Sequence, residues 1–338
     1  MKVLRPSRMI ASITAILFVL MLVSAASAEG NPPKVSFKKD AGRMDILIGG
    51  RPIATYVYED PMIPRPYFCQ VKTMDGVQIT RIHPPDPVIN KGNDDHSTFH
   101  PGLWLAFGDI GGNDFWRNKA RVRHVKFVEP FIEREREGRF TVVNSYERID
   151  GQGDPICEES CTYSIRVYGC GYFLLASSEF RSGLADIVFG DQEEMGLGIR
   201  LNTPLTVKFG SGKIFNSEGG KNEEGTWGKQ TKWCGAMGPI DGRIVGAVVM
   251  ADPNNFRPSW YHTRDYGLIV ANAFGKKAMT GPDDAQVTPD STRVQKGKPF
   301  HLGYGVFIFD VCDYKGLSLD SDYRLYLELI ADEAKSLK

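Results

Sequence analysis

The sequence predicts an all-β protein, a large antiparallel β-sandwich that ends in one C-terminal α-helix. Most apolar segments are short, rich in Val, Ile, Phe and Tyr, and separated by Gly, Asn, Asp or Pro about every ten residues. Examples are residues 44–58, 139–149, 162–180 and 300–309. Many short strands joined by turns favour two packed sheets, because a single sheet would leave its apolar face uncovered.

The first 28 residues have the features of a secretory signal peptide. Three basic residues precede an apolar run that starts at Met9 and ends in the Ala-Ser-Ala sequence of residues 26–28. We expect cleavage after Ala28 and a mature protein in the periplasm or the medium. No later segment reaches about 18 uninterrupted apolar residues, so we expect no membrane span in the mature chain. Residues 29–338 should form a single β-sandwich domain.

Two local patterns support particular elements of this fold. Gly49 and Gly50 separate two apolar runs and can adopt the positive φ angles that a two-residue hairpin turn requires. Residues 320–338 have the spacing of an amphipathic helix, with Asp320 or Ser321 as its N-cap. The apolar stripe of this helix consists of Tyr323, Leu327 and Ile330.

Charge and cysteine content exclude several functional classes. The chain has 41 basic and 41 acidic residues. Without the three basic residues of the signal segment, 38 basic and 41 acidic residues remain, which gives a net charge of −3. This balance does not indicate a nucleic-acid partner. The six cysteines include no C-x-x-C pair, which argues against a zinc ribbon. Cys157 and Cys161 either close a small loop or are buried free thiols.

The first of three polar clusters lies in residues 93–116. Asp95, His96 and His100 precede the apolar sequence LWLAFG, which we expect to form a strand that anchors the loop. A His-x-x-x-His spacing could bind a metal on a helix, but the Pro-Gly pair that follows opposes a helix here. Acid/base or ligand-binding roles are favoured, with Trp116 as a wall of the cleft. Solvated loop residues are the structural alternative.

The second cluster lies in residues 191–201, where strand parity separates two faces. Glu194 and Arg200 fall on the face opposite to the core and are separated by two glycines, which predicts room for a flat ligand. Glu193 has the parity of the buried face, so Glu194 is the better catalytic candidate unless a bulge exchanges them. An exposed Glu/Arg ion pair is the alternative. The residues predicted to face the core are Met195, Leu197, Ile199 and Leu201.

The third cluster lies in residues 255–275. Trp260, His262, Arg264 and Tyr266 share one parity and form a row of aromatic and cationic groups. Aromatic faces cover the C–H surface of a pyranose, while Arg and His hydrogen-bond its hydroxyls. The row therefore favours a sugar ligand, and a structural Arg–Trp ladder is the alternative.

Five motifs over nearly the whole mature chain resemble the bacterial family labelled methane oxygenase PmoA, a domain of unknown function. They are RPYF, DDHSTFHPGLWLAFGDIGGNDFW, EEMGLGIR, WGKQTKWC and WYHTRDYGLIVANAFG. A subunit of membrane methane monooxygenase would need several apolar spans, which this sequence lacks after residue 28, so we do not expect methane oxidation. The all-β pattern is also similar to the galactose mutarotase-like supersandwich of sugar epimerases.

The favoured hypothesis is an exported enzyme that acts on a sugar or oligosaccharide by His/Glu acid/base chemistry, with no cofactor and no metal. His96 or His100 would serve as acid and Glu194 as base. The alternatives are a non-catalytic carbohydrate-binding module and a metal-dependent oxygenase or hydrolase that uses the histidines. The expected catalytic residues are His96, His100, Glu194 and His262. The expected substrate-binding residues are Arg65, Asp95, Trp116, Arg200, Trp260, Arg264, Asp265 and Asn272.

Overall fold

The computed structural model describes residues 31–281, 283–313, 315 and 317–336. The predicted signal peptide, residues 1–28, lies outside these residues. Residues 33–338 form one unit, and the predicted domain start at residue 29 stays a prediction. None of the helices among the described residues is both long enough and apolar enough to cross a bilayer.

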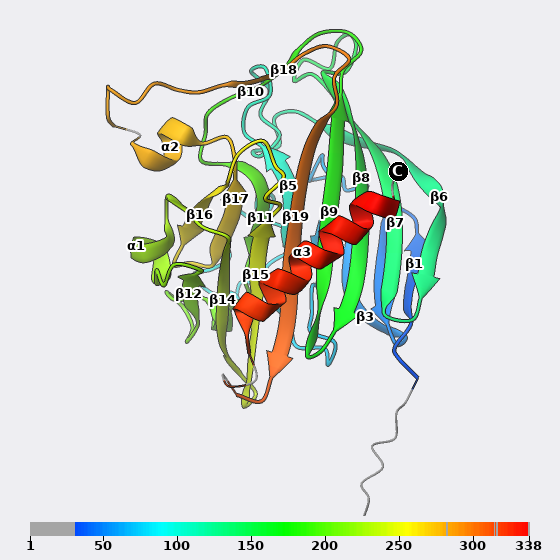
Figure 1. Cartoon of the computed structure of the whole chain (residues 1–338), viewed down its shortest axis with the longest axis vertical. Coiled ribbons are helices and arrows are strands. Elements are labelled where there is room, and N and C mark those ends of the chain that lie inside the picture. Colours follow the sequence, from blue (N-terminus) through cyan, green and yellow to red (C-terminus); the bar gives the residue numbers. More distant parts are fainter. Residues whose placement is uncertain (1–30, 282, 314, 316, 337–338) are drawn as a thin grey trace, which may run out of the picture. The chain divides into compact units, whose positions relative to one another are not determined.

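Two antiparallel sheets dominate this unit and confirm the predicted β-sandwich (Figure 1). The nine-stranded sheet has the order β1 (Val35–Asp40), β2 (Arg43–Ile48), β3 (Arg51–Val57), β4 (Tyr67–Cys69), β5 (Leu103–Phe107), β11 (Met195–Arg200), β17 (Leu268–Asn272), β16 (Trp260–Arg264), β13 (Lys229–Gln230). The eight-stranded sheet has the order β12 (Lys213–Asn216), β14 (Trp233–Ile240), β15 (Arg243–Ala251), β19 (Phe300–Val311), β9 (Gly171–Arg181), β8 (Cys157–Tyr168), β7 (Glu137–Tyr146), β6 (Val122–Arg134).

The remaining elements are short, apart from the C-terminal helix. A two-stranded ribbon pairs β10 (Ile187–Phe189) with β18 (Thr292–Val294). The helices are η1 (Thr203–Leu205), α1 (Asn222–Thr226), α2 (Lys276–Thr280) and α3 (Leu319–Ser336). The sequence predicted only the last of these, because helices of three to five residues are too short to show a 3.6-residue period.

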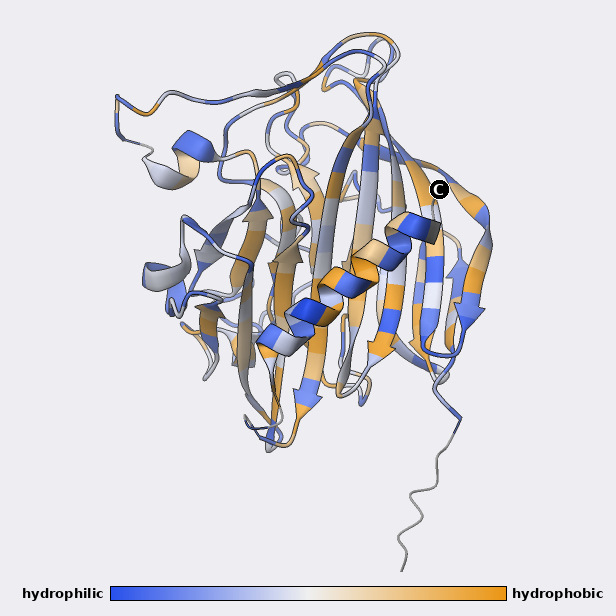
Figure 2. Ribbon diagram, in the orientation of Figure 1, coloured by the Kyte–Doolittle hydropathy of each residue, from blue (hydrophilic) through white to orange (hydrophobic). Residues whose placement is uncertain are grey.

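The main core lies between the two sheets, where side chains of alternating strand positions meet. Ile199 and Ile269 of the nine-stranded sheet belong to the same buried cluster as Val142 and Ile308 of the eight-stranded sheet. Figure 2 shows the hydrophobic and hydrophilic residues that alternate along several strands. Because side chains alternate between the two faces of a strand, one face of each sheet packs in the main core and the other face is available for further contacts.

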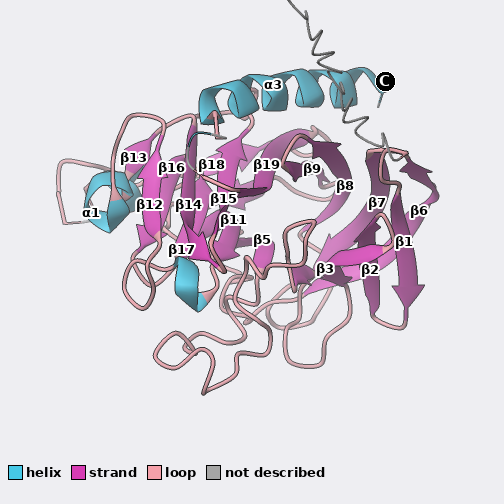
Figure 3. Ribbon diagram, turned by 90° about the horizontal axis from the view of Figure 1, so that it is seen from below, coloured by secondary structure: helices cyan, strands magenta, loops and turns pink. Residues whose placement is uncertain are grey.

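The predicted hairpin and helix are both present. Gly49 and Gly50 have φ angles of 58° and 79° and join Ile48 to Arg51, as a two-residue turn requires. Helix α3 covers the outer face of the eight-stranded sheet, and Figure 3 shows it along one side of that sheet. Its predicted stripe of Tyr323, Leu327 and Ile330 packs there, together with the fully buried Tyr326.

The cap of α3 differs from the expectation. The helix begins at Leu319, so Asp320 and Ser321 lie inside its first turn and neither is the N-cap. All six cysteines are free thiols, and Cys157 and Cys161 are both buried on β8. Burial raises the pKa of both thiols above the usual range, which keeps them protonated.

Candidate functional site

Several of the predicted site residues lie on the face of the nine-stranded sheet that points away from the main core. Trp104, Gly198, Val270 and His262 stand opposite one another across β5, β11, β17 and β16. Residues in direct register project to the same side of a sheet. Arg200 and Arg264 flank Leu268 in the adjacent row. The predicted inward residues Met195, Leu197, Ile199 and Leu201 all belong to the main core, which confirms the parity of β11.

The predicted room for a flat ligand above the glycines of β11 is not there. A Cβ atom at Gly198 would lie 2.7 Å from Cζ2 of Trp104 and 3.1 Å from Cη2 of Trp116. Both indoles are buried, in a second apolar cluster with Leu268 and Val270. The protein's own rings therefore fill the space that the missing side chain leaves, and Trp116 is packing material at this point of the sheet.

Above these indoles lies a set of residues that we call the stacked histidine cluster: Asp95, His96, His100, Trp104 and Arg200. The His100 ring stacks on Trp104 with a centroid distance of 5.1 Å and on His96 at the same distance. Arg200 donates to Nδ1 of His100 at 3.2 Å and to Oδ1 of Asp95 at 2.5 Å. Oδ2 of Asp95 lies 2.6 Å from Nδ1 of His96.

Hydrogen bonding fixes the tautomer of His100. A guanidinium has only donors, so Nδ1 of His100 must be the accepting nitrogen and Nε2 carries the proton in the neutral ring. Burial, followed by the charge of Arg200, lowers the pKa of His100 well below 6.5. His100 is therefore neutral near pH 7 and cannot be the proton-donating acid proposed from the sequence, although it can donate a hydrogen bond.

Asp95 and His96 form the accessible end of this cluster. The His96 side chain is 47% exposed, and its backbone has a φ angle of +49°, a left-handed conformation in which His is enriched among non-glycine residues. Burial raises the pKa of Asp95, but Arg200 and His96 lower it more, so the pKa falls below its usual value. An ionised carboxylate thus holds Nδ1 of His96 and leaves Nε2 as the nitrogen available for proton exchange.

Arg81 is a part of this region that the sequence did not reveal. Its guanidinium is buried and donates to four backbone carbonyls of the loop, those of Asn93, Asp95, His96 and His100. Such contacts shape the loop that carries the histidines. They leave no periodic signal, because a side chain that binds backbone carbonyls does not depend on which residues supply them.

A second set of residues, which we call the His262 site, consists of His262, Glu193, Arg264, Asn272 and Glu223. Nδ1 of His262 lies 3.1 Å from the backbone carbonyl of Glu193, which also accepts from Asn272 at 3.2 Å. Arg264 pairs with Glu193 at 3.3 Å and with Glu223 at 3.1 Å. His262 is buried, and burial lowers its pKa, so the ring is neutral near pH 7.

Of the two adjacent glutamates, Glu193 does not follow the parity predicted for it. Strand β11 begins at Met195, so alternation does not extend to residues that precede it. The Glu193 side chain is 40% exposed, which makes the prediction of a buried carboxylate wrong. Glu194 is more enclosed and forms an ion pair with Arg117, a partner that the sequence did not indicate.

Four other predicted ligand-binding residues have structural contacts. Arg65 is buried and donates to the carbonyl of Phe99 at 2.6 Å. Asp265 accepts from the backbone N–H of Glu223 at 2.9 Å. Asn272 donates to the carbonyl of Gln192 at 2.7 Å and accepts from two backbone N–H groups. Trp260 is buried. These contacts hold the loops around the face.

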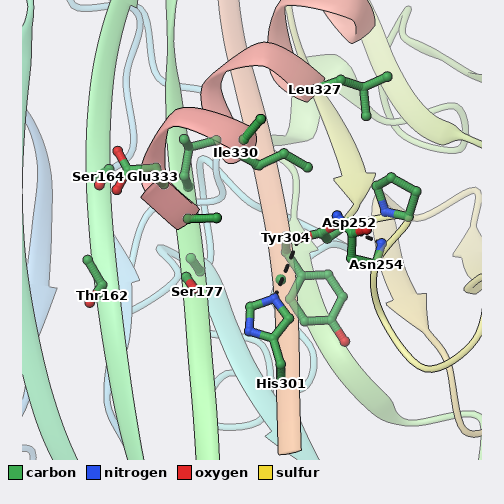
Figure 4. A pocket seen from close by; sticks show the side chains of 16 residues that line it. Thr162, Ser164, Ser177, Asp252, Asn254, His301, Tyr304, Leu327, Ile330 and Glu333 are labelled. Atoms are coloured by element: carbon green, nitrogen blue, oxygen red, sulfur yellow. Dashed lines mark hydrogen bonds and ion pairs between the residues drawn. The ribbon is translucent and has the colours of Figure 1, made fainter. Parts of the chain in front are cut away.

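Cavities lie beside this face and on the other sheet. A cleft of about 700 Å³ adjoins the His262 site, and its lining includes Arg264, Glu223 and Trp227. A cavity of about 580 Å³ lies between α3 and the eight-stranded sheet (Figure 4), with Asp252 and His301 at its rim. None of the predicted site residues lines the second cavity. The described residues contain no group of three or more His, Cys, Asp or Glu side chains arranged to hold a metal ion.

Comparison with protein families identifies the chain at this point. Residues 43–313 match the model of a family of unknown function, DUF6807. The chain belongs to this family. The match includes every strand of both sheets except β1, and every residue of the stacked histidine cluster and the His262 site. Its description carries no activity. A search of curated proteins finds no match.

Two solved structures show limited similarity to this DUF6807 protein. One is an α-galactosidase from Lactobacillus brevis, with a TM-score of 0.41, 9% identity and coverage of 83% of this chain and 40% of that chain. The other is a putative kojibiose phosphorylase from the human microbiome, with a TM-score of 0.30, 12% identity and coverage of 63% and 23%. The chain thus spans less than half the length of either protein, and at these TM-scores neither similarity indicates a function.

Proposed function

We propose that this DUF6807 protein binds a sugar or glycan fragment at the outer face of the nine-stranded sheet and acts on it by acid/base chemistry through His96. The Asp95–His96 contact carries the proposal. It joins an accessible imidazole to an ionised carboxylate at 2.6 Å, so one ring nitrogen is oriented and the other can take or give a proton. His96 is then the working group, and Asp95 is a positioning residue.

The charge pattern of the face favours a neutral ligand rich in hydroxyls. Carboxylates and guanidinium groups occur in pairs here, as Asp95 with Arg200, Glu194 with Arg117, and Glu193 with Arg264. Paired charges create no large field of one sign, but they still offer acceptors and donors to hydroxyl groups. Glu194 is the proposed second proton-transfer group, because epimerase- or lyase-type chemistry needs an acid and a base.

The test is turnover of a sugar panel by the purified protein: D-glucose, D-galactose, L-rhamnose and their p-nitrophenyl glycosides. His96→Gln and Asp95→Asn should each lower kcat at least about 100-fold, the usual contribution of a general acid or base. The melting temperature of His96→Gln should stay close to wild type, since the His96 side chain is 47% exposed. Asp95→Asn also removes the charge that pairs with the buried Arg200, so its kcat is compared at a temperature at which the variant is still folded.

His301→Gln is the matched control. His301 is 43% exposed and lies 3.5 Å from Asp252, but on the eight-stranded sheet. Its turnover should equal that of wild type. Unchanged kcat in His96→Gln would refute the proposed role of His96. Sugar binding without turnover in the wild type would favour a carbohydrate-binding module, and stoichiometric copper, iron or zinc in the purified protein would favour the metal-dependent alternative.

We also propose that the protein works outside the cytoplasm. The support is the order of basic residues, apolar run and Ala-Ser-Ala in residues 1–28. A mature N-terminus at Glu29, found by sequencing the exported protein, would support this, and an intact Met1 in the membrane fraction would contradict it.

A further inference from the structure

His262 combines burial with an unused ring nitrogen. Its side chain lies in the sheet row that contains Trp104, Gly198 and Val270. Nε2 of His262 is buried and has no hydrogen-bond partner in the described part of the protein. His83 and His124 also have an unpartnered nitrogen, but both residues are only half-buried. A buried polar atom without a partner costs about 1–3 kcal/mol, which a ligand can recover.

The contact at the opposite side of the ring decides what Nε2 can do. Nδ1 lies 3.1 Å from the carbonyl of Glu193, and a carbonyl can only accept, so Nδ1 carries the proton. In the neutral ring Nε2 therefore has the lone pair. It is an acceptor for a hydrogen bond or a proton, and it cannot donate.

The backbone of Glu193 is itself fixed, which makes this tautomer rigid. Asn272 donates to the carbonyls of Gln192 and Glu193 at 2.7 and 3.2 Å. Its own Oδ1 accepts from the backbone N–H groups of Phe274 and Gly275 at 2.7 and 3.0 Å. The carbonyl that orients His262 thus cannot turn away without the loss of several buried hydrogen bonds.

We propose that Nε2 of His262 accepts the hydroxyl proton of the bound sugar in a hydrogen bond, and so fixes the position of that hydroxyl in the site. This assignment rests on the proposed function. His262 does not itself line the cleft of about 700 Å³, so a sugar in that cleft reaches the buried Nε2 only when Arg264, which lines the cleft and pairs with Glu193, moves aside. The ligand group must be a donor, which a hydroxyl is and an ether or carbonyl oxygen is not.

Two substitutions separate the roles of the two ring nitrogens. In His262→Asn the side-chain amide can still donate to Glu193, in place of Nδ1, but nothing occupies the position of Nε2. In His262→Gln the amide oxygen reaches toward the Nε2 position. The probe is whichever of D-glucose, D-galactose and L-rhamnose binds the wild type most tightly. We expect Kd to rise about tenfold in His262→Asn and about threefold or less in His262→Gln, the size of one neutral hydrogen bond.

Nitrogen-15 NMR of histidine-labelled wild type gives a readout that does not depend on the variants folding. The expected spectrum at pH 7 shows His262 with a protonated Nδ1 and a bare Nε2, and the sugar should shift the Nε2 resonance. A protonated Nε2, an Nε2 resonance that the bound sugar leaves unmoved, or an unchanged Kd in His262→Asn would overturn the proposal.

The outcomes also separate this proposal from the proposed function. If His96→Gln loses turnover while His262→Asn keeps the wild-type Kd, only the assignment of His262 fails. If no sugar of the panel binds to or reacts with the wild type, both fail.

Discussion

His100 and His262 are two imidazoles at equal depth on the same face of the nine-stranded sheet, and they have opposite hydrogen-bonding characters. Each is 3% exposed, and burial lowers the pKa of both. Nδ1 of His100 meets the guanidinium of Arg200, whereas Nδ1 of His262 meets the carbonyl of Glu193. A partner that only donates leaves Nε2 of His100 protonated, and one that only accepts leaves Nε2 of His262 bare. Burial sets the charge, and the neighbour sets the tautomer.

The largest loss of stability should come from removal of the Arg200 guanidinium, the donor in the stacked histidine cluster. Arg200→Met leaves Asn93, Asp95 and His100 without the guanidinium that all three contact. Oδ1 of Asn93 and Nδ1 of His100 are then buried acceptors without their donor, at a cost of about 1–3 kcal/mol each, and we expect a loss of at least about 2 kcal/mol in urea unfolding.

Arg264→Met is the matched control for the His262 site. Arg264 also forms two ion pairs, but they are partly exposed, so we expect a loss of about 1 kcal/mol or less. Equal losses in the two variants would contradict the contrast between a fully buried guanidinium, that of Arg200, and a partly exposed one, that of Arg264.

The second expected effect is a pH dependence of the unfolding free energy, to which His100 and His262 should both contribute. The unfolded imidazoles protonate near pH 6.5, while the folded rings stay neutral because their pKa values are lowered. The unfolded state then binds more protons, so stability falls as the pH drops below about 6.5, until the folded pKa is reached. Each histidine contributes up to about 1.4 kcal/mol per pH unit in this window.

The measurement is urea unfolding of wild type, His100→Asn and His262→Asn between pH 7.5 and about 5, still above the usual carboxylate pKa values. Both variants should show a shallower dependence of the unfolding free energy on pH. A wild-type slope in either variant would mean that its histidine binds protons equally in the folded and unfolded states.

The smallest effect is expected for Glu193→Gln. Its carboxylate is exposed in part and pairs with Arg264, so its loss should change the unfolding free energy by about 1 kcal/mol or less. The backbone carbonyl that orients His262 remains in this variant, and the tautomer seen by nitrogen-15 NMR should not change. A large drop in melting temperature would instead indicate that the Glu193 carboxylate is buried, as strand parity predicted.

Strand periodicity explains what could be predicted about the fold and the site. The period of two correctly sorted Leu197 and Ile199 from Arg200, and two glycines in sequence marked a tight turn. The rule failed at Glu193, because the strand starts two residues later. Strand periodicity also did not predict the role of Arg81, because the partners of Arg81 are backbone carbonyls of a loop.

The prediction of free space above Gly198 was wrong for a related reason. The sequence shows that a side chain is missing there, but it does not show which ring comes from elsewhere to fill the space. Trp104 stands directly opposite Gly198 in the neighbouring strand, and Trp116 arrives from a loop. A pairing register was needed to see this, and register depends on long-range contacts that one sequence does not display.

The position of β19 has a consequence for the order in which the eight-stranded sheet can assemble. This strand is the last of the eight-stranded sheet in the sequence, yet it lies inside the sheet, between β15 and β9. Both of those neighbours precede β19 in the chain, so each has one unpaired edge until residues 300–311 are available to pair with it. The sheet therefore closes only after residues 300–311 have been made, and α3 can cover its outer face only after that.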